Sequence, residues 1–202
     1  MTLANTRLSS QSIPASVSLK RWTVDEYHRI SSLGILMPDE RTELLAGHIT
    51  LMAAKGTTHV LVTRLLSQAL DKLLADQPAF VSTQEPIHID ELSEPEPDIF
   101  IVQGTVRDYE KHHPHPEEVL LIIEVSDSTL KQDCEIKDKL YAQAGVADYW
   151  VVDVNNRQLH IFREPASGGY ASHLILKEPH EVSPLAFPDV VLSLTSFLPS
   201  AS

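Results

Sequence analysis

Two acidic residues in the middle of the chain have the type and position to bind a metal ion. Glu124 lies inside the apolar segment "VLLIIEVS", and Asp98 directly precedes another apolar segment, "IFIV". A continuously apolar strand is normally covered on both faces, so we expect Glu124 to be at least partly buried, where an unpaired carboxylate is costly. Carboxylates brought together from neighbouring strands repel each other unless a divalent ion joins them. Mg²⁺ prefers such hard oxygen ligands.

A lysine follows at a position that could complete this chemistry. On a helical wheel with about 100° per residue, Lys137 falls in the core-facing stripe formed by Leu130, Cys134 and Tyr141, whereas Lys139 falls on the opposite face. Two carboxylates that hold a metal beside a lysine suit phosphodiester hydrolysis. The metal polarises the phosphate and lowers the pKa of an attacking water, and the lysine orients that water or stabilises developing charge.

The elements that must position these residues follow from periodicity, caps and turn residues. The pattern predicts a helix over 23–33, a hairpin turning at Ala46-Gly47, a Thr-capped helix over 57–75, strands over 79–90, 97–102 and 119–125, a helix over 129–144, a strand over 148–153, a hairpin around 167–169 and a short segment over 190–198. Pro86 indicates an edge or a bulge in the first of these strands. We therefore expect one α/β domain over residues 20–202, with a mixed sheet flanked by helices and a disordered leader over residues 1–19.

Composition sets limits on function. The chain has 202 residues and a formal net charge of −12, which counts against an extended phosphate-binding face, although a small cleft can still bind nucleic acid through metal ions. The single cysteine excludes an intrachain disulfide and a zinc site built from cysteines. No apolar run approaches the roughly 18 to 20 residues of a membrane span, and the first residues lack the apolar core of a signal peptide, so we expect a cytoplasmic protein without membrane contact.

The residues that could do chemistry also carry a family resemblance. "PD" at 97–98, "EVS" at 124–126 and the order helix, three strands, helix, strand resemble the PD-(D/E)xK nuclease superfamily, which includes restriction endonucleases. More closely, "ELLAGHITLM", His59, "PDIFIV", "IIEVSDST" and "DCEIKDKLYAQAGVADYWVVD" resemble a widespread bacterial family described as putative restriction endonucleases of unknown function. This resemblance extends over residues 22–198.

The resemblance implies a restriction-endonuclease-like fold and a metal-dependent nuclease. It implies that Asp98 and Glu124 bind Mg²⁺ or Mn²⁺ and that Lys137 assists catalysis. Glu43 and His59 match further family positions, where they are expected to complete the cleft. The implied partner is nucleic acid, with DNA as the first expectation. A homodimer would agree with the paired sites of double-strand cutters in this superfamily.

The chain departs from the superfamily pattern at one position. The superfamily's lysine usually follows the glutamate by two residues, and that position holds Ser126 here. In several members the lysine has moved to the following helix, and Lys137 fits this substitution. The alternative interpretation is a non-catalytic interaction protein that keeps the fold and uses Glu124 and Lys137 as a structural ion pair.

Other candidate motifs receive ordinary structural interpretations. Pro188-Asp189 repeats the look of Pro97-Asp98, but no apolar strand with an acidic residue follows it. We interpret the histidines of "HHPHPEE" as part of a solvated loop rather than a zinc site, and Cys134 as a small apolar core residue. The chain has no nucleotide-binding phosphate loop, no dinucleotide-binding glycine pattern and no nucleophile elbow.

Overall fold

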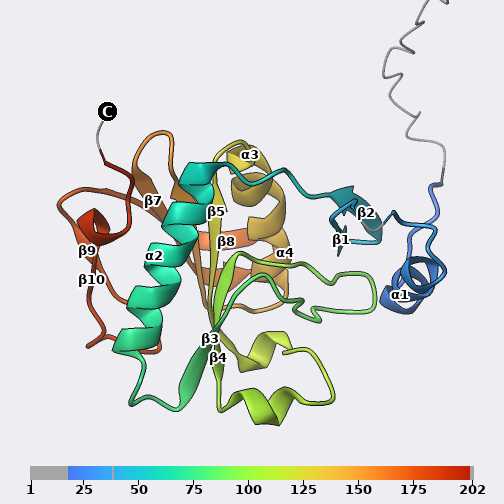
Figure 1. Cartoon of the computed structure of the whole chain (residues 1–202), viewed down its shortest axis with the longest axis horizontal. Helices are drawn as coiled ribbons and strands as arrows, with labels where there is room; N and C mark the ends of the chain where they lie inside the picture. Colours follow the sequence, from blue (N-terminus) through green and yellow to red (C-terminus); the bar gives the residue numbers. More distant parts are fainter. Residues whose placement is uncertain (1–17, 38, 201–202) are drawn as a thin grey trace, which may run out of the picture.

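The computed structural model describes residues 18–37 and 39–200, and a six-stranded mixed sheet forms its centre (Figure 1). The strand order is β3-β4-β5-β6-β7-β8, and within this sheet β5 and β6 are parallel while the other neighbouring pairs are antiparallel. The strands are β3 (Ala79–Ser82), β4 (Ile99–Gln103), β5 (Val119–Ser126), β6 (Asp148–Asp153), β7 (Gln158–Ala166) and β8 (Gly169–Lys177). The predicted mixed sheet and C-terminal hairpin are confirmed.

Helices cover both faces of the sheet. On one face, α2 (Thr57–Leu73) packs Leu66 and Leu70 against Ile99 and Ile123. On the other face, the segment made of α3 (Leu130–Gln132), η3 (Asp133–Lys137) and α4 (Asp138–Gln143) packs Tyr141 against the sheet. Since successive strand residues point to opposite faces, the apolar strands β4 and β5 contribute side chains to the cores on both faces, as their unbroken apolar sequences indicate.

The predicted helix over 129–144 is interrupted by a π-helical stretch. η3 carries the wider hydrogen-bonding pattern of a π-helix between two short α-helical pieces. Asp133 and Lys137, four residues apart in this stretch, are both 4% exposed, and Lys139 is exposed. The predicted directions of the two lysines are therefore confirmed, although the helix is not uniformly α-helical.

The N-terminal part forms the predicted helix and hairpin. Helix α1 (Val24–Ser32) begins with the predicted capping box of Thr23 and Glu26. Strands β1 (Thr42–Leu45) and β2 (His48–Leu51) are joined by Ala46 and Gly47, which have positive φ angles of 49° and 80°. This conformation matches the two-residue turn that suits the twist of a hairpin.

Two predictions about local structure are wrong. Helix α2 has Gly56 as its N-cap and no capping side chain, so the expected threonine cap is absent. The strand predicted over 79–90 ends at Ser82, because Gln84 adopts a positive φ of 58° and Pro86 lacks an amide hydrogen for a ladder. The expectation of an edge position is confirmed, since β3 is the first strand of the sheet.

The remaining described segments are short and lie around the sheet. They are η1 (Val106–Tyr109), η2 (Pro116–Glu118), the paired strands β9 (Glu181–Val182) and β10 (Leu192–Ser193), and η4 (Leu194–Ser196). Of the predicted leader, residues 1–17 lie outside the described residues. Among the residues that are described, no helix combines the length and apolar character needed to cross a membrane.

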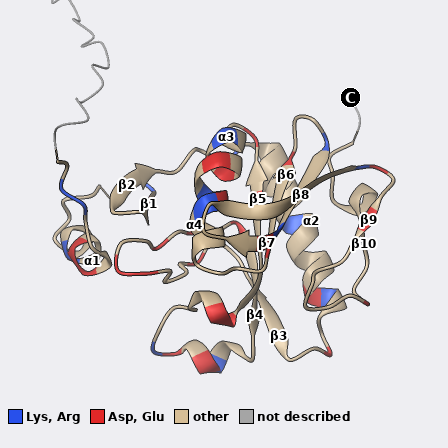
Figure 2. Cartoon of the chain, turned by 180° about the vertical axis from the view of Figure 1, so that it is seen from behind, with Lys and Arg blue, Asp and Glu red and all other residues tan. Residues whose placement is uncertain are grey.

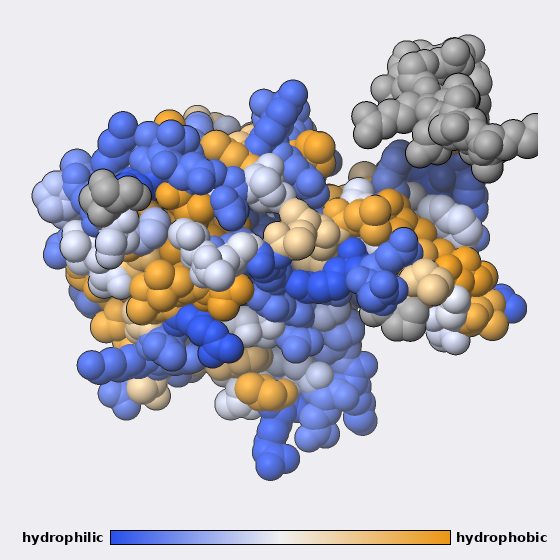
Figure 3. Space-filling view, turned by 45° about the horizontal axis from the view of Figure 1, so that its top comes forward, coloured by the Kyte–Doolittle hydropathy of each residue, from blue (hydrophilic) through white to orange (hydrophobic). Residues whose placement is uncertain are grey.

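Exposed apolar side chains gather on the N-terminal part of the molecule. Leu33, Ile35, Met37 and Leu51 are each more than half exposed. In Figure 3 this apolar surface lies at the right, over the region of α1 and the β1–β2 hairpin. The sheet core beside it is filled by α2 on one face and by α4 on the other.

Candidate active site

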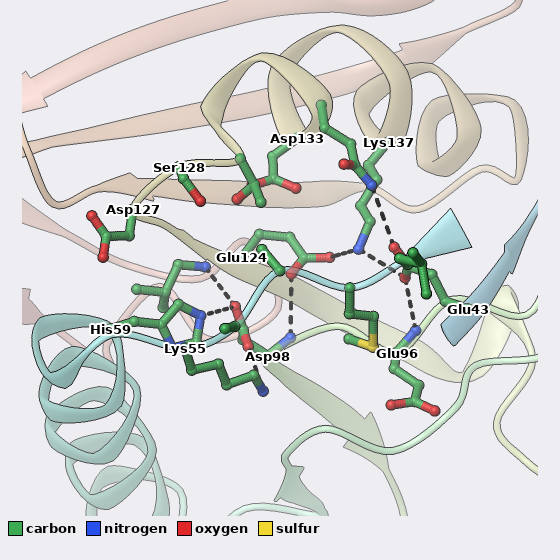
Figure 4. Close-up of a pocket in the computed structure, with 17 residues that line it drawn as sticks. Glu43, Lys55, His59, Glu96, Asp98, Glu124, Asp127, Ser128, Asp133 and Lys137 are labelled. Atoms are coloured by element: carbon green, nitrogen blue, oxygen red, sulfur yellow. Dashed lines mark hydrogen bonds and ion pairs between the residues drawn. The ribbon is translucent and has the colours of Figure 1, made fainter. Parts of the chain in front are cut away.

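All five residues proposed for the site line one cavity of about 60 Å³. The cavity lies at the C-terminal end of β5, where the start of β4, the first turn of α2, the α3–η3 segment and the β1–β2 hairpin meet. The five residues are Glu43, His59, Asp98, Glu124 and Lys137. Figure 4 shows Asp98 and Glu124 side by side, with Glu43 and Lys137 on one side and His59 on the other.

The sheet register places the two central carboxylates opposite each other. Ile99 of β4 pairs with Ile123 of the antiparallel strand β5. The next pair toward the cavity is therefore Asp98, which precedes β4, opposite Glu124 of β5. The Asp98 N–H donates to Glu124 Oε2 at 3.3 Å, and the Val125 N–H donates to Asp98 Oδ2 at 3.0 Å. The backbone of each strand thereby fixes a carboxylate of the other.

Lys137 bridges two carboxylates from different elements. Its Nζ lies 2.9 Å from Glu124 Oε1 and 2.9 Å from Glu43 Oε2, and all three side chains are at most 5% exposed. Tyr141, one turn further along the helix, donates its hydroxyl to Glu124 Oε1 at 3.2 Å. The Glu96 N–H donates to Glu43 Oε2 at 3.3 Å, which ties the hairpin carboxylate to the segment before β4.

Asp98 contacts two basic side chains, His59 and Lys55, on the side away from Lys137. His59 Nε2 lies 2.9 Å from Asp98 Oδ2, and the His59 ring is oriented by Thr63, whose hydroxyl lies 3.5 Å from Nδ1. Lys55 Nζ lies 3.3 Å from Asp98 Oδ1. Burial alone would raise the pKa of Asp98, but His59, the Val125 N–H and Lys55 outweigh burial and lower it.

Comparison with known proteins identifies a matching family. Residues 24–195 match the Uma2 family model, which is described as "Putative restriction endonuclease". The chain belongs to this family. A search of curated proteins finds no significant match.

A solved structure supports the fold of this Uma2-family chain. It is the crystal structure of a putative nuclease of DUF820 from Anabaena variabilis, with a TM-score of 0.67, 16% sequence identity and coverage of 87% of this chain and 96% of that chain. At this identity the likeness shows the fold. It confirms the predicted α/β architecture resembling a nuclease.

Ser126, at the position where the superfamily usually carries its lysine, has a different task in this Uma2-family chain. Its hydroxyl donates to Asp133 Oδ2 at 2.6 Å, and the Thr129 hydroxyl donates to the same oxygen at 2.7 Å. The ammonium beside Glu124 instead comes from Lys137 on the helix, with Nζ 2.9 Å from Glu124 Oε1. The structure therefore shows a lysine beside the glutamate although the usual sequence position lacks one.

More buried carboxyl groups than lysines line the cavity. Of the described residues, four buried carboxylates line it against two lysines, Lys55 and Lys137. Burial raises the pKa of Glu124 to about 8, with Lys137 opposing this shift and the other carboxylates adding to it. Burial would lower the pKa of Lys137, but Glu124 and Glu43 hold that pKa well above its ordinary value, so Lys137 remains a cation.

Three residues near the site were not predicted to have these contacts. Lys55 lies in a loop without periodicity, and no local sequence pattern predicts its contact with Asp98. Tyr141 was assigned to the apolar stripe, which does not show where its hydroxyl points. Asp133, one turn before Lys137, is buried and accepts hydrogen bonds from two hydroxyl groups.

Proposed function

We propose that this Uma2-family protein is a metal-dependent nuclease that hydrolyses phosphodiester bonds of nucleic acid, with DNA as the first substrate to test. The observation that carries the proposal is the pairing of Asp98 and Glu124 across β4 and β5 in a cavity that also contains the Lys137 ammonium. Family membership supports a nuclease in general terms. The assignment of the metal and of the roles below is our own.

The carboxylates fit a hard divalent cation. Asp98 and Glu124 supply oxygen ligands, the carbonyl of Val125, the residue after Glu124, is a further candidate oxygen ligand, and the surplus of buried carboxyl groups favours an added positive charge. Within residues 18–37 and 39–200, no three His, Cys, Asp or Glu side chains converge as a metal site made from side chains alone. Mg²⁺ commonly uses one or two carboxylates and keeps several waters, so two carboxylates suffice.

Each protein group then has a defined task. A bound Mg²⁺ or Mn²⁺ would supply charge stabilisation at the phosphate and a more acidic water. Asp98 and Glu124 would hold it, and His59 keeps Asp98 oriented through the 2.9 Å contact. Lys137 stays protonated, so it orients the attacking water or stabilises developing charge, and it does not act as a base.

A second candidate is a non-catalytic interaction protein with the same fold. The contacts of Lys137 with Glu43 and Glu124 favour it, because a buried lysine between two carboxylates also explains these charges as a structural group. The two candidates differ in their response to a divalent ion. A nuclease site should bind the ion, whereas a structural ion group should not.

The first test measures metal binding and cleavage together. We expect Mg²⁺ or Mn²⁺ to raise the melting temperature of the wild type by selective binding to the folded state, and Asp98→Asn to abolish that rise. Supercoiled plasmid, single-stranded DNA and RNA would be incubated with each ion, and cleavage should be lost in Asp98→Asn. Asp76→Asn is the matched control, because Asp76 is exposed and does not line the cavity. Folded wild type with neither cleavage nor a metal response would favour the interaction protein.

A further inference from the structure

The two lysines of the cavity have different contacts. Lys137 Nζ is engaged by Glu124 and Glu43 at 2.9 Å each, and its side chain is 5% exposed. Lys55 Nζ is also buried, but its 3.3 Å contact with Asp98 lacks hydrogen-bond geometry, and the ammonium donates to no acceptor among the described residues. Two of the three N–H donors of Lys137 are therefore engaged by protein carboxylates, whereas no described residue accepts a hydrogen bond from the Lys55 ammonium.

The other groups around Asp98 are already committed. His59 is engaged with Asp98 through Nε2 and with Thr63 through Nδ1. Figure 4 shows Lys55 approaching Asp98 from the side opposite Glu124 and Lys137. An ammonium removed from water without an acceptor is costly, so an acceptor supplied by a ligand would stabilise this arrangement.

The cavity limits the kind of acceptor that fits. Glu43, Asp98, Glu124 and Asp133 already repel anions, so an entering anion needs both the metal and a free cationic donor. A phosphate diester carries one charge and two non-bridging oxygens. One of these oxygens can face the metal ion that the carboxylates would hold. The other can accept a hydrogen bond from lysine, which binds phosphate as a point charge.

We infer that Lys55 is a further catalytic residue, whose ammonium binds a non-bridging oxygen of the phosphodiester substrate while Lys137 serves the water on the other side of Glu124. This inference rests on the proposed nuclease function and deepens it, because it concerns the phosphate group in the same site. It assigns the two lysines to different parts of one reaction. No proton transfer by Lys55 is involved.

The test uses a small phosphate probe as well as cleavage. Binding of thymidine 3′,5′-bisphosphate would be measured by calorimetry in the presence of Mg²⁺ for the wild type, Lys55→Met and Lys55→Arg. We expect Lys55→Met to weaken binding by about 10- to 100-fold, the range for a lost hydrogen bond to a charged group, and Lys55→Arg to retain part of the affinity. Lys72→Met, at the exposed far end of α2, should bind like the wild type.

Cleavage measured beside binding separates this inference from the proposed function. If the bisphosphate binds through Lys55 but the wild type cuts no nucleic acid, Lys55 binds phosphate as inferred, whereas the nuclease proposal fails and the catalytic role of Lys55 fails with it. If the wild type cuts and Lys55→Met binds and cuts equally well, the inference is wrong and the nuclease proposal stands. Wild type that does not bind the probe also overturns the inference. Melting temperatures of each variant confirm that the proteins compared are folded.

Discussion

At the scale of single residues, Lys137 is the group on which the buried charges depend. Removing its ammonium leaves the carboxylates of Glu43 and Glu124 facing each other without a cation inside the protein. Breaking a buried ion group in this way costs roughly 3–5 kcal/mol. We predict that Lys137→Met lowers the free energy of unfolding by that amount in urea titrations at pH 7, and that it also abolishes cleavage.

A control for Lys137 lies two residues further along the same helix. Lys139 is exposed, so Lys139→Met should change the free energy of unfolding by no more than about 0.5 kcal/mol. Adding Glu124→Gln to Lys137→Met should recover part of the lost stability, because a neutral amide needs neither a buried cation nor a bound proton, whereas Glu124 needs one of them. Equal stability of the Lys137 and Lys139 variants would show that the carboxylates do not require the ammonium.

At the scale of elements, the sequence predicts the supports of the site better than its contacts. Apolar runs identify β4 and β5, and the helical wheel gives the direction of Lys137, because both depend on local periodicity. The register that sets Asp98 opposite Glu124 arises from pairing between two strands that are distant in the sequence, so local periodicity does not predict it. The family resemblance, rather than periodicity, brought His59 and Glu43 into consideration.

The remaining details depend on tertiary packing. Lys55 belongs to a loop, and nothing local indicates that its ammonium reaches Asp98. The π-helical stretch and the early end of β3 at Ser82 depend on neighbours that a pattern of apolar residues does not describe. The contacts of Ser126 with Asp133 and of Lys137 with Glu124 likewise depend on how the helix packs against β5.

Strands β7 and β8 carry a histidine pair that should make stability depend on pH. His160 Nδ1 lies 3.0 Å from His173 Nε2, and the His160 ring is largely buried. Burial lowers the pKa of both rings from the ordinary value of 6.5. At His160 the neighbouring His173 lowers the pKa further and Asp153 raises it. At His173 the carboxylate of Asp138 opposes the lowering of the pKa. Below about pH 6.5 the unfolded chain binds protons more readily than the folded chain, so the stability contribution present above this pH is lost as pH falls toward the lowered pKa values.

This histidine prediction can be checked by unfolding titrations between pH 8 and pH 5. Glu124, whose pKa burial raises to about 8, contributes the opposite trend in the wild type and in His160→Gln alike. We therefore expect acidification to reduce the free energy of unfolding of the wild type relative to that of His160→Gln, whose side chain does not titrate. His113→Gln, in an exposed loop, should follow the wild type. A wild-type curve parallel to that of His160→Gln would mean that the pair accepts protons without cost.

At the scale of the whole molecule, charge directs attention to the cavity rather than to an extended surface. Figure 2 shows lysines and arginines scattered among acidic residues along the described elements, without a continuous basic face. With a net charge of −12, nucleic acid would gain little from long-range attraction. Under the proposed function, binding should therefore depend on the divalent ion and on a small number of phosphate contacts.

Asp148, a buried carboxylate outside the cavity, shows how the fold uses such a group for structure alone. Asp148 is fully buried and accepts from Arg163 Nε, Trp150 Nε1 and the Leu185 N–H, each at 2.8 Å. It thereby connects β6, β7 and the C-terminal segment. Asp153 pairs with Ser126 at the cavity end of β6, so Asp148, five residues away, lies about 16 Å from that end.

We predict that Asp148→Ala lowers the free energy of unfolding by roughly 3–5 kcal/mol, because Arg163 and the Trp150 N–H lose their buried partner. Cleavage per folded molecule and the melting-temperature rise with Mg²⁺ should persist, since the groups around Asp98 are unchanged. Asp76→Ala should alter neither quantity, because Asp76 is exposed. A loss of cleavage in folded Asp148→Ala would instead show that the C-terminal segment shapes the cavity through the sheet. Stability and activity would then both depend on the contacts of Asp148.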